Sequence, residues 1–319
     1  MLSSTHDAIS AAKAGDHSTA CSLLDQCIDE EDDPAGLFQA ALCYRASKRL
    51  NDALRLLKVL EDRGQTRPPA VLLRADIFCA LDRHHHAIPL YGALADIEDA
   101  NMRYAAASGF FQCGDVETAL SLTQSICDSC DQKLASQAIL LRGRCEAACE
   151  NYRGAADAFS AVAGPPSSKR AADFRLARLA LHQGQFPEAL SRLTDLTKVE
   201  SNEKALPDVH ESLLQAYIHS GQTNAALDLI ETKPAAAGIH WLRHATELLC
   251  ELNAPDPLRL MRAKWVESGD PAMFRELLSR HLSLGEKEAA QDLVNDYAEQ
   301  HSKDVHWRWG HLHCLAESG

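Results

Sequence analysis

A short pattern that recurs along the chain constrains the fold more than any other feature of the sequence. In one copy, Gly114 is followed by a polar turn and then by a helix whose first inward-facing residue is Ala119. Other copies start at Gly15, Gly184, Gly221 and Gly285, and in three more the glycine position is taken by Lys48, Asp82 and Glu150. The alanine position is occupied in turn by Ala20, Ala53, Ala87, Ala119, Ala155, Ala189, Ala226, Leu258 and Ala290. Its spacing of 32 to 37 residues is typical of a solenoid, in which similar units stack in a row.

The glycine and the alanine of this pattern each have a physical role. A glycine can end a helix in the left-handed backbone conformation that other side chains resist. An alanine early in the following helix lets the two helices approach closely, because its side chain is small. The pattern therefore predicts an all-α protein built from antiparallel helix pairs.

Two further positions of the repeat make the chain similar to the tetratricopeptide repeat family. Twelve residues before the alanine, the first helix carries a small residue in repeats two to six: Ala41, Ala75, Ala107, Gly143 and Ala177. Three residues later an aromatic residue occurs at Tyr44, Phe78, Phe110 and Tyr217. The resemblance covers the whole chain, as nine repeats and a final helix, and it implies a right-handed superhelical α-solenoid.

We expect residues 1–319 to form one continuous array, because a solenoid grows by adding repeats and needs no second core. Lys233-Pro234 cuts a second helix short, which makes residues 233–238 the predicted hinge. The eighth repeat is the most degenerate. Gly319 lies 34 residues after Gly285, where the next repeat would turn, so we expect the natural protein to continue beyond this chain.

Charge and hydropathy restrict the partners. The net charge of −13 repels phosphate backbones, so nucleic acid is not an expected partner. No apolar run is long enough to cross a bilayer, and the first residues lack the features of a secretory signal, so we expect a cytoplasmic protein without membrane contact. The acidic run from Asp29 to Asp33 is expected to be a solvated loop.

No catalytic motif, cofactor or metal site is expected. The eleven cysteines are an odd number without a signal peptide, which fits reduced thiols used as small apolar residues. Cys127 and Cys130 have a spacing seen in zinc sites, as do Cys145 and Cys149, but the two pairs are predicted at opposite ends of a helix pair. The three histidines from His84 to His86 project about 100° apart on a helix and are expected to form a polar turn.

Function is therefore expected at the surface. In the family that the chain resembles, exposed positions of the first helices line a concave groove. Transferred to this sequence, those positions include Tyr104, Phe111, Arg144, Phe174, Arg178, Gln215, Arg243 and Arg275. Aromatic and arginine side chains are the ones that interface hot spots prefer. Arg144 and Arg178 occupy one position in adjacent repeats, which predicts that they hold an acidic side chain or terminus of a ligand.

The predicted final helix, from Lys303 to Glu317, carries Trp307 and Trp309. These two side chains project about 200° apart, so a single buried face cannot cover both. We expect one of them to lie in an interface, either with a continuation of the chain or with a second copy in a homodimer.

The sequence favours a protein-interaction scaffold, not an enzyme, that binds a peptide or partner domain in the groove of the solenoid. Two alternatives remain open at this point. The array is the repeat domain of a larger enzyme, similar to bacterial hydroxylases and sulfotransferases, or it is a structural part of a bacterial assembly or secretion factor.

Overall fold

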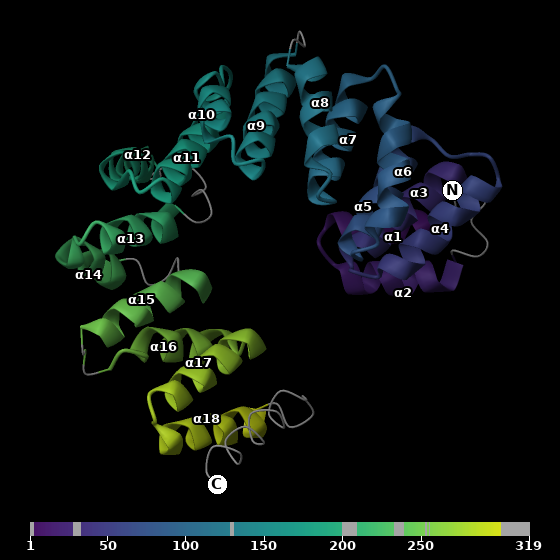
Figure 1. Cartoon of the computed structure of the whole chain (residues 1–319). Coiled ribbons are helices and arrows are strands. Elements are labelled where there is room, and N and C mark those ends of the chain that lie inside the picture. Colours follow the sequence, from purple (N-terminus) through teal and green to yellow (C-terminus); the bar gives the residue numbers. More distant parts are fainter. Residues whose placement is uncertain are drawn as a thin grey trace. The chain divides into compact units, whose positions relative to one another are not determined.

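The computed structural model describes residues 3–27, 33–127, 131–199, 209–232, 239–252, 254 and 256–300. Over these residues all regular structure is helical, in eighteen α-helices that alternate between the first and second helix of a repeat. The nine predicted helix pairs are therefore confirmed (Figure 1).

The first helices of the repeats are α1 Ser3–Lys13, α3 Pro34–Ala46, α5 Pro68–Ala80, α7 Ala100–Gln112, α9 Gln132–Ala148, α11 Pro166–His182, α13 Val209–His219, α15 Ile239–Glu251 and α17 Pro271–Ser283. The second helices are α2 His17–Cys27, α4 Leu50–Asp62, α6 His84–Ala95, α8 Val116–Ile126, α10 Tyr152–Ser160, α12 Phe186–Val199, α14 Thr223–Thr232, α16 Arg259–Ser268 and α18 Lys287–Gln300.

The turns inside the repeats have the predicted left-handed backbone. Gly114 has φ of 85°, and the amide of Asp115 donates to the carbonyl of Phe110 at 2.9 Å, which closes the end of α7. The three positions where another residue replaces glycine are also left-handed, with φ of 61°, 55° and 61° at Lys48, Asp82 and Glu150. The turn geometry is therefore kept even where the residue type that favours it is lost.

The repeated alanine lies between the two helices of each pair, as predicted. Each of the eight alanines, from Ala20 to Ala290, has 0% of its surface exposed. The eighth copy differs: Leu258 is 1% exposed, but it caps the start of α16 instead of lying within that helix. Its larger side chain fills the space at the helix end, so this repeat departs from the pattern.

Helix starts follow from local sequence. Asp33, Asp99, Asp131 and Asp270 precede α3, α7, α9 and α17, and each carboxylate accepts hydrogen bonds from backbone amides of the first turn. The first helix of the sixth repeat begins at Pro166, since proline lacks the amide hydrogen that has no partner in a first turn.

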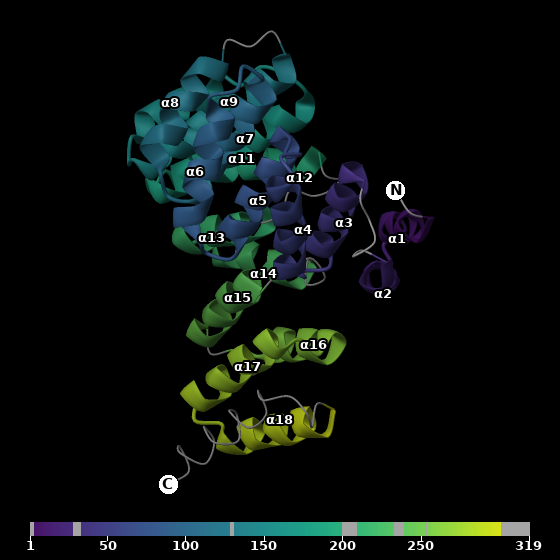
Figure 2. The ribbon, with the colours of Figure 1, turned by 90° about the vertical axis from the view of Figure 1, so that its right-hand side faces the viewer.

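The chain divides into two compact units, Met1–Asp173 and Phe174–Gly319. In the first unit, α1, α3, α5, α7 and α9 each pack against their own second helix, and all but α9 also contact the next first helix in the series. In the second unit, α15 to α18 follow one another in chain order (Figure 2). We call the exposed side of the first helices within each unit the first-helix face.

Some expectations concern residues outside the described ranges. These are the hinge at 233–238 and the tryptophans Trp307 and Trp309. The single continuous array also stays a prediction. Among the described helices, none has both the length and the apolar character needed to span a membrane.

Candidate partner-binding face

Three of the predicted groove residues come together in the first unit. Tyr104 and Phe111 lie two turns apart on one side of α7. From the neighbouring helix α9, Arg144 places its guanidinium carbon 4.5 Å from the centre of the Phe111 ring. We call Tyr104, Phe111 and Arg144 the α7–α9 cluster.

The charge of Arg144 affects its neighbours in the α7–α9 cluster. Burial raises the pKa of the Tyr104 hydroxyl, and the positive charge of Arg144 opposes part of that rise in pKa. All three side chains are half-buried, so each keeps an accessible surface. In the described part of the chain, Arg144 forms no ion pair with a carboxylate, and its charge remains available to one from a ligand.

One predicted groove residue of the second unit lies in the core. Phe174 is only 7% exposed and packs among Leu193, Val209 and Leu213, so the expectation that it lines an open groove is corrected. A large aromatic ring gains more free energy by packing against these apolar side chains than by remaining in water. Arg178 follows one turn later, with an exposed side chain whose guanidinium carbon lies 6.0 Å from the Phe174 ring.

Other predicted groove residues of the second unit take part in a chain of polar contacts across α13, α15 and α17. The amide nitrogen of Gln215 lies 2.8 Å from Nε2 of His244. Arg243 donates two hydrogen bonds to Glu276, at 2.8 and 3.1 Å. One turn along each helix, Arg280 donates to Glu247 at 2.8 Å and to Glu276 at 3.3 Å. We call this set the polar ladder.

The polar ladder changes the role expected of Arg243. Its hydrogen bonds lower the pKa of Glu276, and those bonds in turn raise the pKa of Arg243. Two of the N–H groups of Arg243 are therefore already bonded to one carboxylate, and in the structure this residue joins α15 to α17. By contrast, Arg275 has an exposed side chain on α17.

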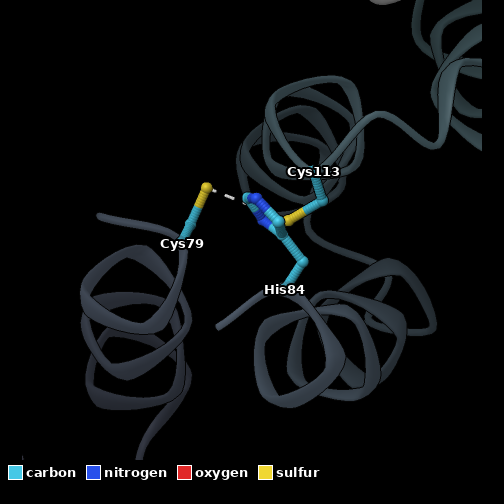
Figure 3. Close-up of side chains that lie close together, drawn as sticks. All are labelled: Cys79, His84 and Cys113. Atoms are coloured by element: carbon cyan, nitrogen blue, oxygen red, sulfur yellow. Dashed lines mark hydrogen bonds between the residues drawn. The ribbon is translucent and has the colours of Figure 1, made fainter. Parts of the chain in front are cut away.

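A group of side chains that the sequence analysis did not predict lies in the first unit. Cys79, His84 and Cys113 point toward one another from the ends of three helices (Figure 3). Their sulfur and ring nitrogen atoms lie within 4.8 Å of one another. Burial and the neighbouring Cys79 thiol raise the pKa of Cys113 to about 12, so Cys113 is a neutral thiol at pH 7 rather than a reactive nucleophile.

The two cysteine pairs considered from the sequence remain apart from this group. Cys145 is buried in the core, Cys149 is exposed, and Cys130 lies outside the described residues. Over the residues with described positions, Cys79, His84 and Cys113 form the one group of three or more such side chains within reach of a single ion.

Solved repeat proteins share this fold. A tetratricopeptide repeat protein from Parabacteroides merdae is 13% identical, with a TM-score of 0.56 over 77% of this chain and 92% of that one. The apo form of RapI is 12% identical, with a TM-score of 0.56 over 99% and 96% of the two chains. The apo form of the quorum sensor NprR from B. thuringiensis is 16% identical, with a TM-score of 0.54 over 82% and 85%.

These likenesses confirm the predicted fold, a helical solenoid of tetratricopeptide-like repeats. No model of a protein family matches the sequence, and no curated protein does. The likenesses therefore concern the fold, and the function has to be argued from the residues.

Proposed function

We propose that this chain is a protein-interaction scaffold that binds a peptide or a partner domain on the first-helix face. The observation that carries the proposal is the α7–α9 cluster, in which Arg144 is stacked 4.5 Å from the Phe111 ring beside Tyr104. Tyrosine and arginine are enriched where binding energy concentrates in interfaces, because they combine a large contact area with directional hydrogen bonds.

The stacking of Arg144 prepares it for binding. An arginine side chain that is already held against a ring loses less conformational entropy when it binds than one that is free in water. The ring covers one face of the guanidinium, while its N–H groups, which lie in the plane, remain able to donate to a carboxylate. The cluster therefore fits a ligand with an apolar side chain next to an acidic side chain or a C-terminal carboxylate.

The charge of the whole chain supports selectivity at this position. With 45 acidic residues against 32 lysines and arginines, most of the surface repels acidic ligands. An unpaired arginine on the first-helix face is then a local attraction, and Arg178 and Arg275 extend the same chemistry to the second unit. The free cysteines among the described residues suit a reducing compartment, so we place the scaffold in the cytoplasm.

The similar structures are consistent with a binding function for this chain. One of them, NprR, is a quorum sensor, a protein that responds to another molecule. We propose that this chain likewise works by binding another molecule.

A selection of peptides on the intact chain tests the proposal. A random peptide library displayed on phage is enriched on the immobilised protein, and the affinities of the recovered peptides are measured by calorimetry. We expect peptides that contain a carboxylate near an apolar residue. In the variant with Arg144→Ala and Arg178→Ala, their affinity should fall by about tenfold or more, since a hydrogen bond to a charged group contributes about 1.5–3 kcal/mol.

Arg142→Ala is the matched control. Arg142 lies on the same helix α9 but about 200° around it from Arg144, so this change should leave binding unaltered. Equal affinity for the wild type and the double variant, with helicity intact, would place the ligand elsewhere on the protein.

A further inference from the structure

The repeat itself brings the sulfur atoms of Cys79 and Cys113 together. The two residues are 34 positions apart, at equivalent places near the ends of α5 and α7. Equivalent positions of consecutive repeats lie side by side in a solenoid, so this spacing stacks one cysteine next to the other. His84, the first residue of α6, comes from the turn between α5 and the following helix and completes the group (Figure 3).

The distance between the sulfur atoms fits a shared metal ion. Sγ of Cys79 and Sγ of Cys113 are 3.8 Å apart. A disulfide would require about 2.05 Å. Two thiolates bound tetrahedrally to one zinc ion at about 2.3 Å each are separated by roughly 3.8 Å. The two cysteines thus have the separation of ligands to one ion without any change of the backbone.

The imidazole of His84 supplies an independent observation. Its Nδ1 atom is buried and has no hydrogen-bond partner among the described residues. A buried polar nitrogen without a partner costs free energy, and a bound ion would remove that cost. The other ring nitrogen, Nε2, lies 3.9 Å from Oδ1 of Asp82. That carboxylate is exposed and free to turn toward the ring, as the carboxylates that orient metal-binding histidines do.

The group borders an open pocket. Cys79 and His84 line an open pocket of about 490 Å³ together with Arg45, Asp76 and Gln112. Three protein ligands with an accessible fourth position are a known arrangement for zinc, where water or a donor atom of another molecule completes the tetrahedron.

We propose that Cys79, His84 and Cys113 bind a zinc ion that links the third and fourth repeats. Two thiolates and one imidazole form a ligand set that suits Zn²⁺ better than Mg²⁺ or Ca²⁺, which prefer oxygen. Each thiol releases its proton as the zinc–sulfur bond forms. The ion joins the ends of α5, α6 and α7, and the first helices α5 and α7 carry part of the first-helix face.

Cobalt substitution tests this assignment. The full chain is reduced, freed of metal with a chelator and titrated with Co²⁺ and then with Zn²⁺. We expect one Co²⁺ per chain, with a thiolate-to-cobalt charge-transfer band in the near ultraviolet, and loss of this band as Zn²⁺ displaces the cobalt. Zn²⁺ should also raise the midpoint of thermal unfolding, because an ion that binds only the folded chain stabilises it.

Variants assign the ligands. Removing a residue that only hydrogen-bonds to a metal ligand typically lowers metal affinity about 10- to 100-fold. Removing a ligand itself, in Cys79→Ser, Cys113→Ser or His84→Ala, should lower the affinity at least as much. Cys149→Ser, at an exposed thiol, and His85→Ala, the adjacent exposed histidine, are matched controls that should leave the titration unchanged. Circular dichroism checks that each variant is folded. If a cysteine variant does not fold, His84→Ala still tests the site.

Three outcomes would overturn the proposal. The first is a reduced wild-type chain that gives no charge-transfer band and no thermal shift with Zn²⁺. The second is an unchanged titration in the folded His84 and cysteine variants. The third is a chain that holds a disulfide between Cys79 and Cys113 when purified without reductant and binds no metal after reduction.

Discussion

The alanine near the start of each second helix sets how closely the two helices of a repeat approach. Ala119 is 0% exposed, so nothing larger fits between α7 and α8 without moving them apart. A second close approach lies nearby, at Gly109 on α7. A Cβ atom built on Gly109 would lie 2.3 Å from the ring of Tyr91, whose hydroxyl is fixed by a 2.9 Å hydrogen bond to Asp76.

Ala119→Glu tests the packing at this scale. The carboxylate would have to be buried without a partner or would force α7 and α8 apart, and either outcome should cost about 3 kcal/mol or more of unfolding free energy. Chemical denaturation monitored by circular dichroism measures the change. Ser121→Glu, at an exposed position of the same helix, is the control and should have little effect. Unchanged stability of Ala119→Glu would refute the packing of the repeat.

Single residues also show where a prediction from the sequence ends. The repeat positions predicted the buried alanines and the left-handed turns, because both follow from backbone geometry within one helix pair. They did not predict that Phe174 is buried or that Arg243 is paired, because both depend on contacts from other helices. Glu276 is 33 residues from Arg243, one repeat further along. This spacing was the signal in the sequence that the two residues lie side by side.

At the scale of elements, the polar ladder connects the first helices of three repeats. Glu276 receives hydrogen bonds from Arg243 on α15 and from Arg280 on its own helix, and only 18% of its side chain is exposed. These bonds favour the ionised carboxylate in the folded chain, which is why its pKa lies below the ordinary 4.5.

The lowered pKa of Glu276 gives a stability that depends on pH. This contribution is complete above the unfolded pKa of about 4.5 and is lost as the pH falls from there through the lower pKa of the folded state. We therefore expect Glu276→Gln to lower the unfolding free energy by about 1–3 kcal/mol at pH 7 and by less at pH 3. Thermal melts at the two pH values measure this. Glu251→Gln, at an exposed position, is the control, and an equal loss at both pH values would contradict the role given to Glu276.

The group of Cys79, His84 and Cys113 also depends on contacts between helices, which the sequence does not predict directly. Short cysteine spacings, as in Cys127 and Cys130, are the usual signal of a metal site in a sequence, and the run from His84 to His86 predicts a polar turn. The ligands that meet in space come instead from the ends of three helices. The signal in the sequence was the repeat period, which places Cys113 34 residues after Cys79.

For the whole molecule, the repeat period predicted the number of helix pairs, and the glycine and alanine positions predicted that each pair is antiparallel. The division into two compact units lies within α11, between Asp173 and Phe174, and no feature of the repeat pattern marks it. The first-helix face continues through successive repeats within each unit, so a ligand can make several separate contacts along it. The central claim is that a protein partner binds on this face and not on the second helices.

Site-specific photocrosslinking in the expressing cell tests this claim most directly. A photoreactive amino acid replaces Ser108, which lies on α7 between Tyr104 and Phe111, one turn from each. A matched variant carries the same group at Gln124, an exposed position of the second helix α8. We predict a discrete crosslinked protein from the Ser108 position that disappears with Arg144→Ala and is absent from the Gln124 position. A partner crosslinked at Gln124 and not at Ser108 would contradict the account.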